Sequence, residues 1–294
     1  MTRDCDYKIT LTDNRGRVLT VSPDSPCRLI EGGLEGFACA GFDVRLRAYA
    51  SSAGGYAETR RFAERELAMT FTVEDREDGE NEDAETIRRL IVSMMDPAED
   101  LILDAELWGE RRQITVIPVD GPQFRRPHFH HPLEVTLNFC APEVFFREPE
   151  PTGVQFRDGV PLFACPLNLW AGAGTVSGLL RVRNEAEIQN PGDGPCGVVV
   201  TFRAEGGAVV HPSVTAGGKY IRCPLTLADG DEMEIDTRPR RKTITVNGER
   251  VFLFDRDSTF FQLPPGMTPV TVGADEGEDY LKARIAFTPI YYGM

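Results

Sequence analysis

The residues best suited to metal chemistry form a histidine cluster, His128-Phe-His-His131. In a strand, His128 and His130 lie on one face, and the carboxylate of Glu134 follows shortly after them in the chain. Imidazole and carboxylate are both zinc ligands, but two imidazoles leave a four-ligand site incomplete. The cluster also lies between two prolines at the start of an expected strand. We therefore interpret it as a polar loop and expect no metal site.

A second group that could bind a cation is the acidic run Asp229–Asp236. Calcium loops of the EF-hand type need oxygen ligands at several fixed positions and a glycine at the sixth. The spacing of this run does not match that pattern. We interpret it as a hairpin turn followed by a strand whose acidic side chains face water.

Two further groups could recognise a ligand without catalysis. The segment Arg238–Lys242 is a basic tip between two expected strands, which could bind a phosphate or an acidic partner or could be a solvated hairpin turn. Four aromatic side chains could stack on sugars, although aromatic residues of β-sandwiches usually lie in the core: Trp170, Tyr220, Phe252 and Phe254. A carbohydrate-binding role is therefore kept as an alternative.

The chain contains none of the short motifs that mark nucleophilic or nucleotide-dependent enzymes. It has no G-x-S-x-G, no P-loop and no G-x-G-x-x-G that opens a helix. An acid pair for glycoside hydrolysis stays open, because that chemistry depends on a separation in space that a sequence does not show. We expect a protein that is not an enzyme and holds no cofactor, with a hydrolase carrying a β-sandwich accessory domain as a third hypothesis.

Composition indicates a folded, acidic protein of two domains. The 294 residues are 41% hydrophobic and 27% charged, which is enough to bury a core in each of two domains of about 150 residues. The net charge of −14, of which residues 1–150 carry −11, disfavours binding to nucleic acid or to an anionic membrane. Of the 32 cationic residues 28 are arginines, whose planar guanidinium group suits protein interfaces.

Neither a membrane segment nor a secretion signal is visible. No apolar stretch approaches the roughly 18 residues that span a bilayer, and the first residues lack the apolar segment of a signal peptide. We therefore expect synthesis in a cytoplasm. No C-x-x-C pair occurs, so we expect small buried hydrophobic side chains rather than disulfides or a metal site at the seven cysteines: Cys5, Cys27, Cys39, Cys140, Cys165, Cys196 and Cys223.

The pattern of the first half predicts an α+β domain, a β-barrel or sandwich flanked by one helix. A helix is expected over Asp83–Met95, because apolar residues recur at i, i+3, i+4 and i+7 from Ile87, and Pro97 ends it. Arg65–Val73 alternates apolar and polar residues, as a half-buried strand does. The remaining elements are a hairpin around Asp13–Gly16, loops at Glu31–Gly36 and Ser51–Gly55, and strands at Cys27–Ile30, Phe42–Ala48, Leu101–Trp108, Gln113–Val119 and Leu133–Phe139.

A polar linker near Arg147–Gly153 divides the chain into predicted domains at residues 1–148 and 153–294. After it, about eight short strands with turn signals at intervals near 8–12 residues predict a β-sandwich of the jelly-roll type. The clearest turn is Asn247-Gly248 between two alternating segments, which is the signature of a tight β-hairpin.

The order of these blocks resembles that of phage distal tail proteins, the siphovirus-type tail component often called Dit. No single block is specific, and the resemblance rests on their order along nearly the whole chain. One departure lies at Pro265–Pro269, where the family usually has Pro-Gly-x-Asn, and another is the strongly acidic insert after Val73. The matching blocks are Gly54–Arg61, the strand to Val73, the helix to Pro97, Val135–Phe146, Asn190–Pro195, Leu227–Asp236, Ile244–Glu249 and Ser258–Gly266.

The resemblance implies a structural virion protein of the tail tip, made and assembled in the cytoplasm of a bacterial host. Proteins of that family form a hexameric ring whose N-terminal domains close beneath the tail tube and whose galectin-like C-terminal domains project outward. The implied partners are other copies of the chain, the major tail tube protein and the tail-associated tip protein, with a receptor-binding protein or host surface glycan as a further one. DNA would pass through the lumen without specific binding. The alternative function is a carbohydrate-binding adsorption module of a tail.

The acidic insert Glu74–Glu85 offers a specific contact in such a ring. It holds eight acids and one arginine, and such a block is by default a solvated loop. In a ring it could instead meet a cluster of arginines on the neighbouring copy. The predicted oligomer interface therefore consists of Arg60, Arg61 and Arg65 with Asp75, Asp78 and Asp83.

Overall fold

The computed structural model describes residues 7–74, 84–126, 132–156, 159–161, 178–180 and 184–294. The chain divides into two compact units, the first formed by Met1–Pro149 with Ile290–Met294 and the second by Glu150–Pro289. Residues 290–294 therefore belong to the first unit, although they follow the second unit in sequence. The predicted domains, 1–148 and 153–294, differ from this division because they assign the last five residues to the second domain.

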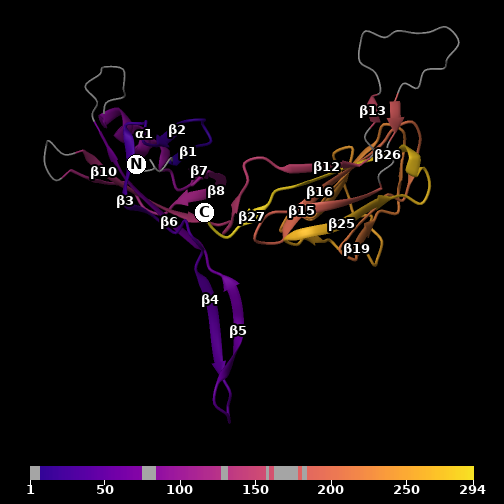
Figure 1. Ribbon diagram of the computed structural model, residues 1–294, viewed down its shortest axis with the longest axis horizontal. Helices are drawn as coiled ribbons and strands as arrows, with labels where there is room; N and C mark the ends of the chain where they lie inside the picture. The colour runs from indigo at the N-terminus through magenta and orange to yellow at the C-terminus, as the bar shows by residue number, and fades with distance from the viewer. Residues whose placement is uncertain (1–6, 75–83, 127–131, 157–158, 162–177, 181–183) are drawn as a thin grey trace, which may run out of the picture. The chain divides into compact units, whose positions relative to one another are not determined.

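The first unit is built mainly from antiparallel strands, with a single α-helix among its described residues (Figure 1). Its elements are β1 (Tyr7–Thr12), β2 (Val18–Val21), β3 (Cys27–Glu35), β4 (Phe42–Ala48), β5 (Gly55–Phe62), β6 (Arg65–Val73), α1 (Ala84–Met94), β7 (Leu101–Leu107), β8 (Glu110–Pro118), β9 (Gln123–Arg125), β10 (Leu133–Ala141), β11 (Phe146–Arg147) and β27 (Ile290–Tyr291).

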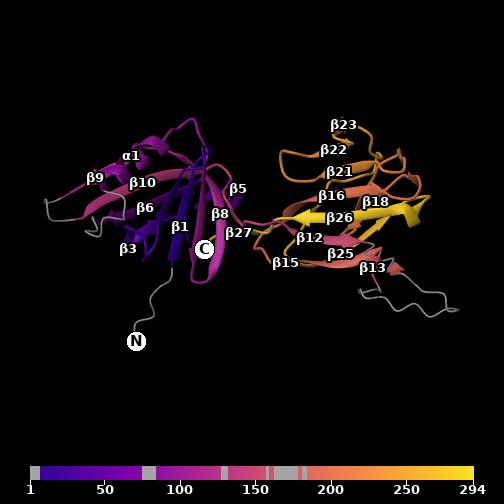
Figure 2. The same cartoon turned by 90° about the horizontal axis from the view of Figure 1, so that it is seen from above.

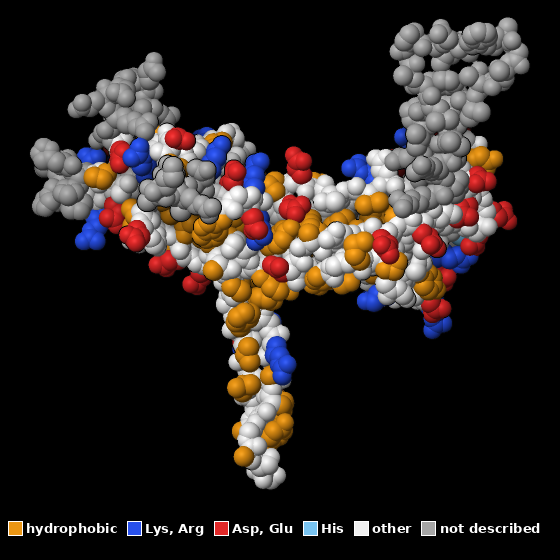
Figure 3. All heavy atoms as spheres, in the orientation of Figure 1, with side chains coloured by type: hydrophobic (Ala, Val, Ile, Leu, Met, Phe, Trp, Pro, Cys, Tyr) orange, Lys and Arg blue, Asp and Glu red, His pale blue; other side chains and the backbone are white. Residues whose placement is uncertain are grey.

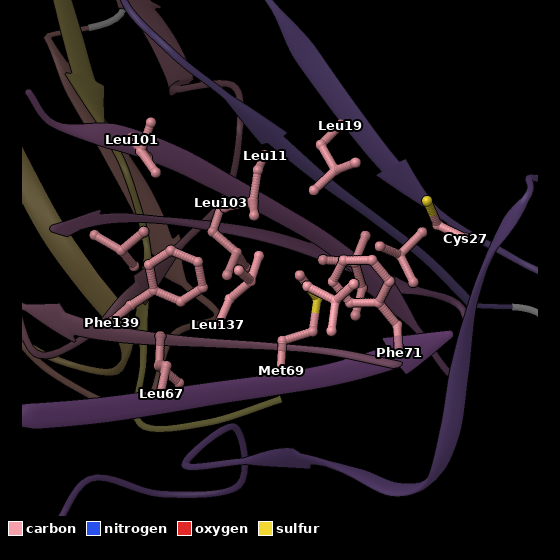
Figure 4. Packing of buried hydrophobic residues seen from close by; sticks show 14 of the residues in the cluster. Leu11, Leu19, Cys27, Leu67, Met69, Phe71, Leu101, Leu103, Leu137 and Phe139 are labelled. Atoms are coloured by element: carbon pink, nitrogen blue, oxygen red, sulfur yellow. The ribbon is translucent and has the colours of Figure 1, made fainter. Parts of the chain in front are cut away.

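The main sheet of this unit has the order β2-β1-β7-β8-β10-β6-β3. Strands β6 and β10 pair from Val73↔Leu133 to Arg65↔Ala141, and every second side chain of both is buried. Figure 4 shows leucines of β1 and β7 on one side of the core and Met69 and Leu137 of β6 and β10 on the other. The two halves of the sheet therefore face one another across one core, and the predicted mainly-β fold is confirmed.

Two local predictions for this unit have different outcomes. The predicted helix is confirmed as α1, whose Ile87, Ile91 and Met94 are buried in the core. The predicted loop at Glu31–Gly36 is wrong, because β3 continues to Glu35 after a shift in its register with β6. The strand can pass close to β6 there because Gly33 has no side chain: a Cβ atom at this position would lie 2.3 Å from the carbonyl oxygen of Thr70.

The second unit is a sandwich of two antiparallel sheets around its own core. One sheet has the order β12-β26-β16-β21-β22-β23, which can be followed strand by strand in Figure 2, and the other has the order β15-β25-β18-β19. The elements are β12 (Thr152–Phe156), β13 (Gly159–Pro161), β14 (Gly178–Leu180), β15 (Glu185–Asn190), β16 (Cys196–Ala204), β17 (Val209–Val210), β18 (Ser213–Ala216), β19 (Lys219–Arg222), β20 (Thr226–Leu227), β21 (Glu232–Asp236), β22 (Thr243–Val246), β23 (Glu249–Val251), β24 (Gln262–Leu263), β25 (Gly266–Gly273), the 3-10 helix η1 (Glu278–Tyr280) and β26 (Leu281–Phe287).

The predicted hairpin at Asn247-Gly248 is confirmed. Val246 of β22 pairs with Glu249 of β23, so two residues form the turn. Asn247 and Gly248 have φ angles of 50° and 83°, and two positive φ values are what a type I′ hairpin turn requires. The side-chain oxygen of Asn247 also accepts a hydrogen bond from the backbone N–H of Glu232, 3.0 Å away, which fixes the turn against β21.

The cysteines are not all buried. Cys27, Cys196 and Cys223 lie in the two cores, as predicted, whereas Cys39 is exposed and Cys140 is half-buried. The prediction of a buried side chain is therefore wrong for Cys39, and Cys5 and Cys165 lie outside the described residues. No helix in the described part of the chain has the length and apolar character needed to cross a membrane.

Alkylation should separate these thiols. Burial raises the pKa of Cys223 to about 12 and that of Cys196 to about 11, so neither forms the reactive thiolate at mildly alkaline pH. Iodoacetamide should modify Cys39 in the folded protein and should reach Cys196 and Cys223 only after denaturation in urea. Peptide mass spectrometry measures both states, and equal rates at Cys39 and Cys223 in the folded protein would contradict the structure.

Candidate functional site

Strands β4 and β5 form a two-stranded sheet of their own, which extends from the first unit as an arm (Figure 1). We call residues 42–62 the arm. The strands pair from Phe42↔Phe62 to Ala48↔Gly55, with one register shift beside Glu58. The pattern of residues 42–55 predicts the first strand and the loop, and the second strand was not predicted. The sequence pattern of the second strand is weak, because most residues of Gly55–Phe62 are small or charged and few are β-branched or aromatic.

One face of the arm is apolar and open to solvent. Phe42, Val44 and Leu46 alternate along β4 and are 67%, 52% and 77% exposed. Large aliphatic and aromatic side chains are seldom left this open when they are contiguous on a monomer. Figure 3 shows hydrophobic side chains along the whole length of the arm. Towards the end of the arm, Tyr49 and Tyr56 are also exposed, with ring centroids 5.8 Å apart, and Tyr56 pairs with Arg47 on the opposite face.

The other face of the arm is held by ion pairs. Arg61 binds Asp43 on the opposite strand at 2.8 Å, and Arg47 lies 3.4 Å from Glu58. Each of these pairs is exposed and contributes little to stability on its own, but together they fix which face is polar. The apolar face of the arm is therefore the one left free for a partner.

The arm is basic although the protein is acidic. It contains four arginines and two carboxylates, a net charge of +2 in a chain of net charge −14. Arg60 pairs with Val44 in the strand register, so it stands on the apolar face, and no carboxylate partner is found for it among the described residues. A basic, apolar arm fits an acidic surface, and much of this protein's surface is acidic.

The base of the arm is fixed by a cluster of aromatic rings. The ring of Phe62 lies 5.0 Å from that of Phe145 and 4.8 Å from that of Tyr292, measured between centroids. Phe145 and Tyr292 are themselves 5.2 Å apart, and Phe42 packs on Phe62 at 5.4 Å. Such pairs add about 0.5–1.5 kcal/mol each beyond area burial. The arm is thus anchored on two segments that lie far from it in sequence.

Arg65 lies directly after the arm and is the largest fully buried side chain of the chain's described part, at 1% exposure. Its Nε donates a hydrogen bond to the carbonyl oxygen of Val144 at 2.7 Å, and its Nη1 donates to that of Gly36 at 3.0 Å. Its remaining donors reach the carbonyl oxygens of Phe37 and Tyr292. Burial lowers the pKa of the Arg65 guanidinium from its ordinary value.

The last residues of the chain are bound around the same point. The guanidinium of Arg112 lies 3.9 Å from the ring centroid of Tyr291 and donates to the carbonyl oxygen of Gly293. The hydroxyl of Tyr291 donates to a carboxylate oxygen of Glu148 at 2.7 Å, and the backbone N–H of Met294 donates to the carbonyl oxygen of Phe37 at 2.9 Å. Residues 290–294 are therefore a structural part of the first unit.

The residues of the predicted oligomer interface differ in whether the structure leaves them accessible to a neighbouring copy. Arg60 and Arg61 are exposed on the arm, as an interface requires. Arg65 is not available to a neighbouring copy, because its guanidinium is buried and bound to carbonyl groups of its own chain. Asp75, Asp78 and Asp83 lie outside the described residues.

The other candidate sites can also be placed. The histidines at 128, 130 and 131 and Trp170 lie outside the described residues. In the acidic run, Asp231 accepts hydrogen bonds from Asn247 and from the backbone of Ala228, which explains its lowered pKa. No group of three or more metal-binding side chains is present in the part of the chain that is described. Among the candidate aromatic residues, Phe252 and Phe254 are exposed and Tyr220 is half-buried.

Comparison with known proteins supports the resemblance seen in the sequence. Residues 191–291 match the family model of the siphovirus-type tail component, C-terminal domain, which confirms that resemblance for the second half. The chain is also similar to the Dit protein (gp 19.1) of phage SPP1, with 15% identity, 96% of this chain and 98% of that chain covered, and a TM-score of 0.65.

A chain of the phage p2 baseplate is similar as well, with 11% identity, 96% and 97% coverage of the two chains and a TM-score of 0.50. At these identities the two structures show a shared fold over nearly the whole chain. Among curated protein sequences, none matches this chain.

Replacement of Arg65 should destabilise the first unit. In Arg65→Met, four carbonyl groups lose their donor, and we expect a loss of about 3 kcal/mol in the free energy of unfolding. The free energy of unfolding of Arg65→Lys should lie between those of the natural chain and of Arg65→Met, because an ammonium group cannot reach all four acceptors. Urea unfolding measures the loss, with Arg61→Met as the control on the arm. Equal stability of Arg65→Met and the natural chain would contradict a structural role.

Proposed function

We propose that this protein is a structural, non-enzymatic component of a phage or prophage tail tip that assembles into a ring with copies of itself. The observation that carries the proposal is the arm, whose apolar face is exposed and whose charge is opposite to that of the rest of the protein. In the ring, the arm of one copy lies against the first unit of the next.

The physical argument begins with the instability of an isolated hairpin. Two strands alone are marginally stable in water, and they gain stability when one face packs against another element. The arm has its polar face satisfied by internal ion pairs and its apolar face uncovered. Association with a second copy would bury Phe42, Val44 and Leu46, at a gain of about 25 cal/mol for each Å² of apolar surface removed from water.

The comparisons give this surface its biological setting. The SPP1 Dit protein, which shares the fold, is described as a paradigm of a hub adsorption apparatus in phages that infect Gram-positive bacteria. By analogy, we assign this chain to a hexameric hub at the virion tail tip, assembled in the cytoplasm of a bacterial host. Its partners would be the major tail tube protein and the tail-associated tip protein, and DNA would pass through the lumen of the ring without specific binding.

A second candidate function is carbohydrate binding by the second unit during adsorption. The observation that favours it is the exposed aromatic segment Phe252–Phe254, in which Phe252 is 81% exposed. Rings this open in water are suited to stacking on a sugar, which has an apolar face and a polar rim. This function is compatible with a hub, since it uses a different part of the chain.

A charge on the apolar face of the arm should weaken self-association. Leu46→Glu places a carboxylate where the ring contact would exclude water, and we expect the dissociation constant for assembly to rise at least tenfold, or about 1.4 kcal/mol. Sedimentation across a range of concentrations measures assembly, and a ring would approach six times the 32.6 kDa of the chain.

The matched control for this variant is Ser51→Glu, which adds the same charge in the loop of the arm, off the apolar face. It should assemble like the natural chain. If the natural chain stays a monomer at every concentration, or if both variants assemble equally well, the arm is not the assembly surface.

Arg60 and Arg61, two exposed arginines of the arm, should make assembly sensitive to salt. Arg60→Glu/Arg61→Glu reverses two charges of the arm, so we expect weaker association that is most evident at low ionic strength, where charge interactions are least screened. The comparison is the dependence of the dissociation constant on salt for the variant and for the natural chain. Identical salt dependence would show that these arginines face no acidic partner.

A further inference from the structure

A cavity of about 570 Å³ opens in the second unit between the basic tip and the first residues of β25. This volume lies within the range of about 300–1,000 Å³ that is usual for small-molecule sites. One chain supplies all of its wall, so the cavity does not depend on assembly. The residues that matter for the argument are Lys219, Arg240, Lys242, Phe260, Gln262 and Thr268.

The charge of the cavity wall is unusual for this protein. Three of the lining residues are cationic and none of the lining residues is acidic, although the chain as a whole has a net charge of −14. No carboxylate is found beside Lys219, Arg240 or Lys242 in the described part of the chain. The neighbouring Arg238 differs, because it forms an ion pair of 2.6 Å with Asp236. The three cations are thus available to an anion.

The wall also contains a polar atom without a partner. Thr268 is 3% exposed, and its hydroxyl has no hydrogen-bond partner among the described residues. Buried hydroxyl groups are nearly always hydrogen-bonded. This one is closed to water as it stands, and a turn of the Thr268 side chain about χ1 would direct it to a ligand in the cavity. Gln262, from β24, adds an exposed amide that can donate or accept.

An aromatic surface completes the cavity. Phe260 lines it, with its ring centroid 6.0 Å from Nζ of Lys242. The ring of Phe254 lies 6.1 Å from that of Phe260, and this contact joins the exposed segment Phe252–Phe254 to the cavity. Arg240, at the tip, has a positive φ of 65°, a strained conformation for a residue other than glycine, which recurs at ligand sites.

We propose that this cavity binds an anionic saccharide, a sugar that carries a phosphate or a carboxylate. The cations bind the anionic group, the ring of Phe260 stacks on the apolar face of the sugar, and Gln262 and Thr268 bind its hydroxyl groups. A neutral sugar would not require the cations of the cavity wall, and inorganic phosphate would not require its aromatic ring. The combination of the two therefore favours an anionic saccharide over either ligand. An acidic protein segment would need a long groove rather than a cavity of this size. The proposal extends the second candidate function and does not require the ring.

Ligand-observed NMR on the full chain tests the proposal with glucose 6-phosphate, glucuronate, glucose, inorganic phosphate and polyglutamate. Glucose 6-phosphate or glucuronate should bind at least tenfold more tightly than glucose or inorganic phosphate. Lys219→Gln/Lys242→Gln should weaken that binding at least tenfold. The matched control, Arg250→Gln/Arg256→Gln, removes two exposed cations of the same unit outside the cavity and should bind normally. Thr268→Val, which keeps the shape of the side chain, should weaken binding several-fold.

Each outcome decides the matter. Preference for glucose 6-phosphate or for glucuronate identifies the source of the charge and supports the proposal. If glucose binds as tightly as glucose 6-phosphate and glucuronate, the cations do not contribute to binding and the proposal is wrong. If inorganic phosphate binds as tightly, the sugar does not contribute and the proposal is wrong. Binding of polyglutamate alone would assign the cavity to an acidic protein, and no binding at all would overturn the site. Leu46→Glu should bind the saccharide normally, so failure of ring assembly and failure of this site are distinguishable.

Discussion

The first unit depends on one buried guanidinium. Arg65 donates to carbonyl groups of four separate positions, and it ties strand β6 to Gly36 and Phe37, to Val144 and to Tyr292. A buried arginine is costly unless its donors are satisfied, and carbonyl groups of irregular backbone are equally costly without donors. The two requirements are met together only in the folded unit, so the four segments adopt their positions jointly. The arm begins next to this point, and its base shares Tyr292 with it.

This arrangement links residues 290–294 to strand β6 and to the base of the arm. Arg65 and Tyr292 are 227 positions apart in sequence, and β27 pairs with β11 across another long stretch of sequence. Contacts of such long sequence separation form late in folding, because the loop must be closed before they can contribute. A chain without residues 290–294 would therefore lack one of the four acceptors of Arg65 and part of the aromatic cluster at the base of the arm.

The sequence could predict what is decided locally. The alternation of Arg65–Val73, the apolar stripe of α1 and the Asn247-Gly248 turn each depend on neighbours in the chain, and all three are confirmed. The burial of Arg65 could not be predicted, since its acceptors come from distant segments and an arginine in a polar context is usually exposed. For the arm, one strand could be predicted but its exposure could not. The alternation of Phe42, Val44 and Leu46 indicates a strand, and an apolar strand face is ordinarily expected to be buried in a core. Here it is exposed because, among the described residues, the arm extends away from the core of its unit and nothing packs on this face beyond the base of the arm.

Two positively charged surfaces stand out on an acidic protein, and they differ in what they can bind. The arm combines its charge with a row of exposed apolar side chains, so it suits a broad protein surface. The cavity of the second unit combines its charge with one ring and a few polar groups in a small volume, so it suits a compact ligand. The acidic remainder of the chain repels other anions from both, and an anion that binds must therefore gain from contacts beyond charge. The arm and the cavity therefore each select partners that combine negative charge with apolar contacts. Neither long-range attraction nor apolar burial alone is enough to hold a partner there.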